Sequence, residues 1–329
     1  MPMNRARRKI ILGGALLALG PVIARAQAPI ATALIVPGAA ATEQTLPGFA
    51  AEAGILESLG VRAQFLRPAG PAAALDALDS GAHLAYSAPT QVAERFLKGG
   101  DVVLVATVIE PNRGGMLMGG PAVRGPANLR GARVAVLSAE GASAAAVQAV
   151  FERLGAGAPA LEPVGSYEAG YAALAGGRVD AAWLPVDLAL KGRVAHGWTT
   201  FEGVRLTLPG GYVTTRRAIG AQRGLIETLM QSLVAAIHFF KADAVSTTRV
   251  LQKVLGVEAA VAAELQAFYA QILRPAPAPS LYYGLNGLRQ ALRARYPAAE
   301  RMQATDLVEP SFIDAMVRDG TIAKLYGQR

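Results

Sequence analysis

An imperfect internal repeat constrains the fold of this 329-residue chain more than any other feature of its sequence. The two copies lie about ninety-five positions apart, and the second preserves the Leu-Gly, Pro and Gly positions of the first. The matched positions are Glu57, Leu59, Gly60, Leu66, Pro68 and Gly70 with Glu152, Leu154, Gly155, Leu161, Pro163 and Gly165. After one residue of slippage, Gly81, Ala85 and Pro89 pair with Gly177, Ala181 and Pro185. The repeat predicts two similar structural units.

Both copies have the same order of elements: a helix, a glycine turn, an apolar strand, a proline and a second helix. Apolar strands that alternate with helices are typical of parallel sheets covered by helices, so the predicted fold class is α/β. We expect strands at 32–36, 63–66, 83–86, 102–107, 133–137 and 179–183. We expect helices at 48–58, 72–78, 89–98, 143–154 and 167–175. Since ligands of open α/β folds bind at the carboxyl edge of the strands, the repeat predicts that Ser87 and Trp183, paired by the alignment, face a shared cleft.

The pattern after Thr215 is helical. Amphipathic spacing predicts helices at 225–240, 247–255 and 264–272, and a proline-rich bend follows at Pro275, Pro277 and Pro279. The tail over 286–326 is again helical in pattern. Because no clear strand pattern accompanies these helices, we expect them to pack around the first unit rather than to form a third domain.

The N-terminus has the three parts of a secretory signal peptide. A basic head (Arg5, Arg7, Arg8, Lys9) precedes an apolar run over 10–19, and Ala24-Arg25-Ala26 is a small-x-small cleavage site. The run is shorter than the roughly 20 apolar residues that cross a bilayer. We therefore expect cleavage after Ala26. Arg7-Arg8 also partly fits a twin-arginine signal, so the Sec and Tat export routes both stay open.

The positive charge of the chain is concentrated in this segment. Five of its residues are Lys or Arg and none is acidic, so the formal net charge falls from +8 to +3 when residues 1–26 are removed. The remaining chain has no cluster of basic residues interleaved with aromatic ones, which argues against nucleic acid as a partner. No later segment is long and apolar enough to predict a membrane span.

The absence of cysteine excludes several classes of chemistry. Disulfides, thiolate catalysis, Cys-ligated metals and the lipid-anchor cysteine of lipoproteins are all ruled out. The three histidines, His83, His196 and His238, are too far apart in sequence to favour a metal site. No nucleophile–base motif or phosphate-binding loop is present. We therefore predict no catalytic residues, no metal and no cofactor.

Several segments together resemble the nitrate/sulfonate/taurine and thiamine-pyrimidine group of ABC-transporter periplasmic binding proteins. Residues 50–60 are similar to its A-x-E-x-G segment, residues 128–136 to its D-L-x-G-K-x-V-A-V segment, and residues 173–182 match most strongly. Residues 77–89 fit as well, although Leu84 stands where Asp is common. Residues 306–312, with Gly320 and Leu325-Tyr326, resemble the C-terminal helix pair of the group.

The resemblance implies a type II periplasmic binding protein fold, in which two doubly wound α/β lobes are joined by a hinge of two crossovers. After the signal peptide at 1–26, residues 27–111 and 215–329 would form the first lobe and residues 112–214 the second. The crossovers would lie near 110–115 and 209–215, where glycines suit backbone rotation. The implied protein is an exported, periplasmic monomer that captures a small organic ligand between its lobes and delivers it to an ABC permease in the inner membrane.

Polar residues at strand-to-helix junctions are the first candidates for ligand contacts. In the second lobe, the loop over 138–143 offers Ser138, Glu140 and Ser143 beside free backbone N–H groups at a helix start, which favour an anion. The Glu140 carboxylate instead favours a ligand with a donor or cationic group. In the first lobe Tyr86, Ser87 and Thr90 occupy the corresponding junction. Ordinary helix capping by Ser143, Ser87 or Thr90 is an equally weighted interpretation.

Five further residues complete the candidate site. Thr42 and Glu43 follow the first strand, and Thr107 ends another. Trp183 has a flat face that suits a ring or an alkyl chain, with a role in the core as the alternative. Tyr212, in the returning crossover, would reach the ligand on closure or only stiffen the hinge. Asp187 is expected to be solvated or to be a helix-start charge.

Two alternative functions use the same fold. An enzyme acting on a pyrimidine precursor or an aromatic acid is the first, and the lack of catalytic constellations weighs against it. A sensor that presents its closed form to a membrane receptor is the second, which the sequence does not separate from transport. The ligand stays open between a small oxyanion (sulfonate, nitrate or organic acid) and a pyrimidine-like or amine-bearing compound.

Overall fold

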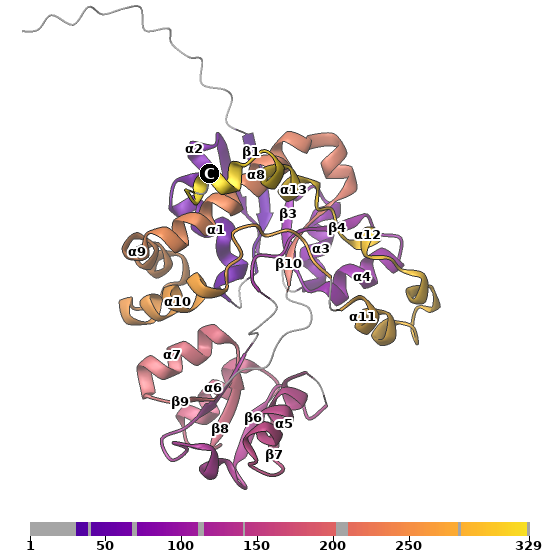
Figure 1. The fold of residues 1–329 in the computed structure, drawn as a ribbon. Helices are drawn as coiled ribbons and strands as arrows, with labels where there is room; N and C mark the ends of the chain where they lie inside the picture. The colour runs from indigo at the N-terminus through magenta and orange to yellow at the C-terminus, as the bar shows by residue number, and fades with distance from the viewer. Residues whose placement is uncertain are drawn as a thin grey trace, which may run out of the picture.

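The computed structural model describes residues 31–38, 41–67, 71–110, 115–140, 142–201, 210–281 and 284–327. The predicted signal peptide, most of the first expected crossover and Gly141 lie outside these residues. Two five-stranded sheets form the centres of two lobes, which Figure 1 shows one above the other.

The first sheet has the strand order β2-β1-β3-β10-β4. β1 pairs in parallel with β2 and β3, whereas β10 is antiparallel to both β3 and β4. The strands are β1 Ala31–Val36, β2 Val61–Phe65, β3 Leu84–Ser87, β4 Val102–Ala106 and β10 Gly211–Thr215.

The second sheet repeats this arrangement in the order β7-β6-β8-β5-β9. β6 is parallel to β7 and β8, and β5 is antiparallel to β8 and β9. Its strands are β5 Met116–Gly119, β6 Arg133–Val136, β7 Ala160–Pro163, β8 Ala181–Leu184 and β9 Thr199–Phe201. Because β1, β2 and β3 correspond to β6, β7 and β8, the two units predicted from the repeat are present.

The helices cover both faces of each sheet. In the first lobe they are η1 Thr42–Thr45, α1 Leu46–Glu52, α2 Ile55–Ser58, α3 Pro71–Asp79, α4 Pro89–Leu97, α8 Arg216–Ala242, α9 Ala244–Leu255, α10 Ala259–Ile272, α11 Leu285–Leu292, η3 Pro297–Arg301, α12 Ala304–Leu307, α13 Ser311–Arg318 and α14 Thr321–Leu325. In the second lobe they are η2 Pro126–Leu129, α5 Ala142–Leu154, α6 Tyr167–Ala175 and α7 Val186–His196. The helix expected at 48–58 is broken into α1 and α2 at Gly54, whose φ of 72° lies in the left-handed region.

The sequence missed four strands, among them β5 and β10, whose antiparallel pairings make each sheet mixed rather than parallel. β5, β7, β9 and β10 were not predicted, and neither was α7. Residues 211–215 were expected within a crossover but form β10, a fully buried strand of the first sheet. Strands of three to five residues carry too little periodicity to be recognised in an apolar sequence.

Alternate residues of each central strand face different helices. In the first sheet Ile35 and Leu84 pack with Phe49 of α1, while Val36 and Ala85 pack with residues of α3 and α4. In the second sheet Val134, Ala181 and Trp183 pack with Val147 and Phe151 of α5. Helix α5 follows β6 as α1 follows β1, and β6 corresponds to β1. The face of the second sheet that α5 covers therefore corresponds to the face of the first sheet that α1 covers.

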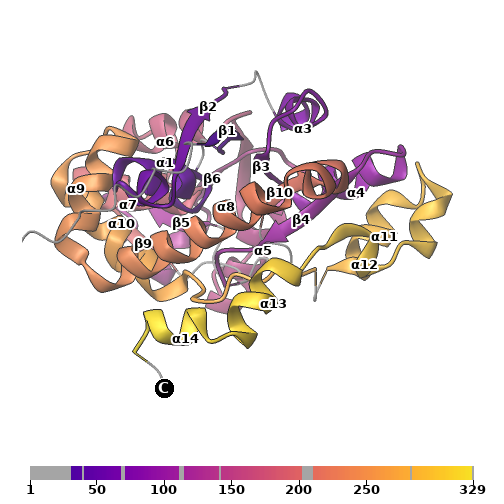
Figure 2. The same cartoon turned by 90° about the horizontal axis from the view of Figure 1, so that it is seen from above.

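The C-terminal helices pack around the first lobe, as predicted. Figure 2 shows α11 to α14 along one side of this lobe, where α13 and α14 contact α8, and α11 and α12 contact α4. Helix α8 has 27 residues and, with a mean hydropathy of 1.2 in its most apolar stretch, is long and apolar enough to span a membrane. The sequence analysis expected no such segment. Because half of that stretch is buried against the first lobe, we interpret α8 as a core helix.

Candidate functional site

The two lobes meet where helix α7 approaches η1 and α10. Figure 1 shows α7 at the side of the second lobe that faces the first, beneath α10. α7 begins directly after β8, with Pro185 as its N-cap and Asp187 in its first turn. η1 follows β1 and carries Thr42 and Glu43. The carboxyl ends of β1 and β8 thus bring these three residues together, as expected for strand ends in an α/β fold.

Asp187 links the lobes through two hydrogen bonds. The Thr42 hydroxyl donates to Oδ2 at 2.6 Å, and the Tyr269 hydroxyl of α10 donates to Oδ1 at 2.7 Å. Burial raises the pKa of the Asp187 carboxyl, and the bonds from Thr42 and Tyr269 oppose that rise. Both oxygens of Asp187 are therefore bonded to groups of the other lobe. Of the two predicted alternatives, a solvated side chain is wrong, whereas a charge at a helix start is confirmed by its place in the first turn of α7.

Glu43 is a second buried carboxyl beside Asp187. Its side chain is 7% exposed, and its Oε2 atom has no hydrogen-bond partner among the described residues. Burial, followed by the charge of Asp187, raises its pKa from 4.5 to about 7. Hydrogen bonds from Tyr269 and Gln44 reduce this rise. Near neutral pH the group exists in both protonated and ionised forms.

Two tyrosines hold the backbone around Glu43. Tyr212 of β10 is fully buried, and its hydroxyl donates to the carbonyl oxygen of Glu43 at 2.8 Å. Its ring meets Tyr86 of β3 edge to face, with centroids 5.3 Å apart at 82°. Burial raises the pKa of both phenols well above the usual range, and the Glu43 charge adds to the rise. Both rings therefore remain neutral hydrogen-bonding groups.

A second contact joins the lobes at the far end of α7. Arg193 forms an ion pair with Glu264 of α10, and both side chains are partly exposed. Apolar residues of the two helices belong to one buried cluster, which includes Val186, Leu190 and Leu265. Helix α7 thus docks the second lobe on the first.

The structure places four of the predicted site residues at this junction: Thr42, Glu43, Tyr86 and Tyr212. Three others of the first lobe have other surroundings. Ser87 donates to Gln91 of α4 at 3.1 Å, and Thr90 is exposed on the same helix. The buried Thr107 hydroxyl accepts the Ser280 backbone N–H at 3.3 Å, and so anchors the C-terminal segment.

The loop before α5 is folded on itself. The buried Ser143 hydroxyl accepts the Leu137 backbone N–H at 3.0 Å, and Ser138 donates to the Glu140 carbonyl oxygen at 2.9 Å. The side chain of Glu140 is exposed. The hydroxyls of both serines are therefore bonded within the loop, and the bond of Ser143 is not the helix capping that was the alternative to ligand binding.

Trp183 corresponds to Tyr86 and not to Ser87. Trp183 and Tyr86 are each the third residue of their strand. Trp183 pairs with Leu117 of the antiparallel strand β5, and Tyr86 pairs with Tyr212 of the antiparallel strand β10. Trp183 is 8% exposed in the cluster on the α5 side, which matches the α1 side where Tyr86 lies. The pairing with Ser87 was wrong by one residue, and such a slip changes the face of the sheet.

Sequence reasoning missed Asp187 and Tyr269 as members of the site. Asp187 had a recognisable signal, since it follows Pro185 at the same kind of strand-to-helix junction that made Ser87 and Thr90 candidates. Tyr269 had none, because only the docking of α7 on α10 brings it to the site. Among the described residues, no group of three or more His, Asp or Glu side chains could hold a metal ion.

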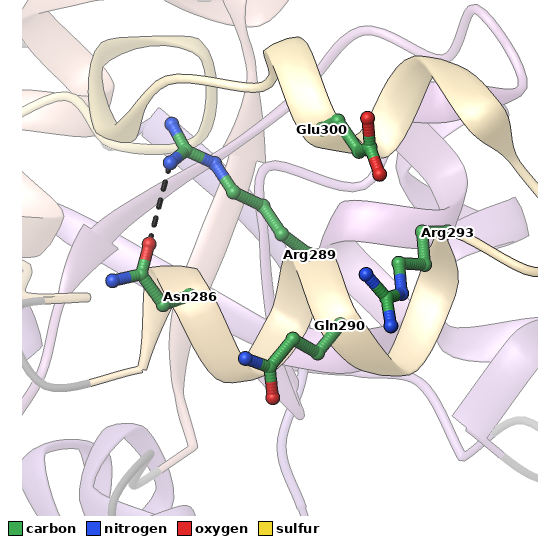
Figure 3. A pocket seen from close by; sticks show the side chains of 5 residues that line it. All are labelled: Asn286, Arg289, Gln290, Arg293 and Glu300. Carbon is green, nitrogen blue, oxygen red and sulfur yellow. Dashed lines mark hydrogen bonds between the residues drawn. The ribbon is translucent and has the colours of Figure 1, made fainter.

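A surface pocket of about 230 Å³ lies elsewhere, on α11 and η3 of the first lobe (Figure 3). It is lined by Asn286, Arg289, Gln290, Arg293 and Glu300. Arg289 donates to Asn286 at 3.3 Å and, through Nε, to the Met302 carbonyl oxygen at 2.9 Å. This arginine is thus engaged in holding α11 to the segment after η3, and the pocket contains no predicted site residue.

Comparison with known proteins supports this description. Residues 47–201 match the model of the NMT1/THI5-like family, which confirms the family resemblance read from the sequence. No curated protein sequence matches the chain.

Solved structures share the fold. The aliphatic sulphonate binding protein SsuA from Escherichia coli is 15% identical with a TM-score of 0.63, and the alignment covers 86% of this chain and 93% of that one. The alkanesulfonate-binding protein SsuA from Xanthomonas axonopodis, solved with MOPS, is 19% identical with a TM-score of 0.57, covering 84% and 96%. A Cys-to-Ser variant of DszB with biphenyl-2-sulfinic acid is 15% identical with a TM-score of 0.58, covering 88% and 99%. The two-lobed α/β fold of periplasmic binding proteins is therefore confirmed.

Proposed function

We propose that this chain is an extracytoplasmic solute-binding protein, which captures a small organic ligand between its lobes and delivers it to an ABC permease. The family match and the fold support a solute-binding role. In this proposal residues 1–26 direct export to the periplasm. The first lobe comprises residues 27–111 and 215–329, and the second lobe comprises residues 112–214. The protein acts as a monomer.

The observation that carries the proposal is the contact of Asp187 with Thr42 and Tyr269. Three polar side chains from two lobes converge on one point, at the carboxyl ends of strands β1 and β8. The unpartnered Oε2 of Glu43 lies at the same point. Separation of the lobes at α7 would expose these groups to solvent. A ligand that enters there would find hydrogen-bonding groups from both lobes, which is how ligand binding drives closure.

The proposed contacts are graded by this geometry. Thr42, Glu43, Tyr86 and Tyr212 form the primary set, and Asp187 and Tyr269 join it. Ser87, Thr90, Thr107, Ser138, Glu140, Ser143 and Trp183 form a secondary set, because the structure gives most of them local partners or a place in the core. The ligand class spans sulfonates, nitrate, organic acids and pyrimidine-like compounds.

A thermal-shift screen of the mature protein, residues 27–329, tests binding directly. The compounds are alkanesulfonates, nitrate, carboxylates, amino-sulfonates, amines and pyrimidines, because specific binding raises folded-state stability by RT ln(1 + [L]/Kd). A compound that raises Tm in proportion to the logarithm of its concentration, and is recovered unchanged, supports the proposal. If no compound of the whole screen stabilises the protein, the proposed function fails.

Uptake of the hit by cells tests delivery. Cells that lack the gene should lose uptake of the compound, and the full-length chain expressed in trans should restore it. A chain without residues 1–26 should not restore it, because it would stay in the cytoplasm. Intact uptake in the deletion strain would instead favour the sensor function.

The DszB neighbour is the specific observation that favours an enzyme. The solved form of that protein replaces a cysteine by serine and holds a sulfinic acid. This chain contains no cysteine, so it lacks the residue type altered there. Incubation of the purified protein with biphenyl-2-sulfinic acid, followed by chromatography, should return the compound unchanged. Turnover of the compound would mean that the protein is an enzyme and would overturn the proposed solute-binding function.

A further inference from the structure

One oxygen of the Glu43 carboxyl has no hydrogen-bond donor in the part of the chain that the structure describes. That oxygen, Oε2, is buried and has no hydrogen-bond partner among the described residues. Solvent does not replace that partner, because the residue is only 7% exposed. A buried carboxylate oxygen without a donor is strongly unfavourable in a folded protein. Such an atom at the junction of two lobes indicates a group that arrives from outside.

Three hydroxyl donors near Glu43 have other acceptors. The Thr42 hydroxyl proton goes to Oδ2 of Asp187, and the Tyr269 hydroxyl proton bonds Oδ1 of Asp187 at 2.7 Å. Tyr269 also lies within hydrogen-bonding reach of the Glu43 carboxyl, but a phenol has one proton to donate. The Tyr212 hydroxyl donates to the backbone carbonyl of Glu43 rather than to its side chain. The Gln44 side chain also bonds the Glu43 carboxyl, yet among the described residues Oε2 of Glu43 still has no donor.

The charges around Glu43 are also of one sign. Asp187 of α7 acts on Glu43 through its charge, and Tyr269 of α10 and Gln44 of η1 through hydrogen bonds. The Glu43 charge in turn raises the pKa of Tyr212 of β10 and of Tyr86 of β3. Asp187 repels the Glu43 charge, and the three phenols are neutral. None of the described groups that shift the Glu43 pKa is a Lys, Arg or His side chain. A sulfonate or nitrate at this point would add a third negative charge in a site of low dielectric.

We propose that the ligand of the interlobe site is a small organic cation, whose protonated amine or amidinium group donates to Oε2 of Glu43 and lies beside Asp187. The inference rests on the proposed function and excludes oxyanions from its ligand class. A cation compensates the paired carboxyls and supplies the missing donor, and charge-assisted bonds of this kind are the stronger ones.

Proton release would accompany this binding. The pKa of Glu43 is about 7 without a ligand, and a bound cation stabilises the carboxylate and lowers that pKa. Below pH 7 the ligand must therefore displace a proton from Glu43. The apparent affinity should rise about thirty-fold between pH 5.5 and pH 8, since a proton competes with the ligand for one group whose pKa is about 7.

Four probes that share one ring test the ligand class: benzamidine and benzylamine as cations, benzoate and benzenesulfonate as anions. Calorimetry of the mature protein should show binding of a cation, with affinity that rises with pH and with protons released to the buffer. Glu43→Gln should lose at least ten-fold in affinity and become independent of pH. The control Glu57→Gln makes the same chemical change at an exposed position of α2 in the same lobe and should bind like the wild type.

The outcomes separate this inference from the proposed function. Binding of benzoate or benzenesulfonate with no binding of the cations overturns the ligand class and leaves a solute-binding protein. Binding of a cation that Glu43→Gln does not weaken overturns the role of Glu43. No binding of any of the four probes also overturns the inference, whereas the proposed function fails only if every compound of the wider screen fails.

Discussion

The hydroxyl of Thr42 donates a 2.6 Å hydrogen bond to Oδ2 of Asp187, and this bond joins η1 of the first lobe to α7 of the second. A bond to a charged acceptor contributes roughly 1.5–3 kcal/mol. We expect Thr42→Val to weaken lobe contact by an amount in this range, because valine keeps the shape but has no donor. Small-angle X-ray scattering should then give a larger radius of gyration than for the wild type.

Thr42→Ser is the matched control for this experiment, because it keeps the hydroxyl and removes only a methyl group. Its radius of gyration should equal that of the wild type. If the serine variant is expanded and the valine variant is not, packing of the methyl group and not the hydrogen bond holds the lobes together.

Glu43→Gln should change stability in a way that depends on pH. The folded-state pKa of Glu43 is raised from 4.5 to about 7, so the folded protein holds this proton more tightly than the unfolded chain does. The resulting stability is fully present below pH 4.5 and is lost as pH rises through about 7. A neutral glutamine avoids the loss, so the variant should be more stable than the wild type by roughly 3 kcal/mol at pH 8.

Urea unfolding at pH 4.5, 6, 7 and 8 measures this difference. The two proteins should have similar free energies of unfolding at pH 4.5, and the gap should open between pH 5 and pH 7.5. A constant gap over the whole range would mean that the Glu43 carboxyl titrates normally in the folded protein.

The positions of Thr42 and Glu43 could be predicted from the sequence because local order suffices for them. Both residues follow the first strand, and the carboxyl end of a strand is where an α/β fold places its site. Asp187 and Tyr269 lie 82 residues apart and meet only through the packing of α7 on α10. No periodicity in either helix specifies that contact.

The Trp183 assignment shows a different limit of the sequence. The repeat correctly paired strands β3 and β8, but glycine and alanine matches fixed the alignment only to within one residue. In a strand one residue separates the two faces, so Ser87 and Tyr86 point to opposite sides. The strand pairings resolve this, because Tyr86 lies opposite Tyr212 and Trp183 opposite Leu117.

Gly192 of α7 should not tolerate a side chain. A Cβ atom there would lie 2.1 Å from the ring of the buried Trp198, whose ring in turn stacks on His196 with centroids 4.9 Å apart. We expect Gly192→Ala to destabilise the protein by roughly 1–3 kcal/mol through overpacking, and to shift tryptophan emission. Urea unfolding and fluorescence spectra measure the two effects.

Gly224→Ala is the contrasting variant in α8, since a Cβ atom there would meet nothing within 4 Å. Alanine in a helix interior is more favourable than glycine, so this variant should gain roughly 0.5–1 kcal/mol. Equal effects at the two glycines would mean that contact with Trp198 does not determine the outcome at Gly192.

His83 completes the pairing of β1 and β3 with its side chain. Its Nδ1 atom accepts the backbone N–H of Leu34 at 2.9 Å, and its Nε2 atom lies 3.1 Å from Oε1 of Gln222, the residue with non-helical backbone angles inside α8. An acceptor at Nδ1 requires the neutral tautomer with the proton on Nε2.

His83→Leu leaves the Leu34 N–H without this acceptor and should lower the free energy of unfolding by roughly 1–3 kcal/mol. His83→Asn places a carbonyl oxygen near the position of Nδ1 and should recover part of this loss in urea unfolding. If asparagine and leucine are equally destabilising, the bond to Leu34 contributes little, and the packing of the imidazole against α8 accounts for the effect.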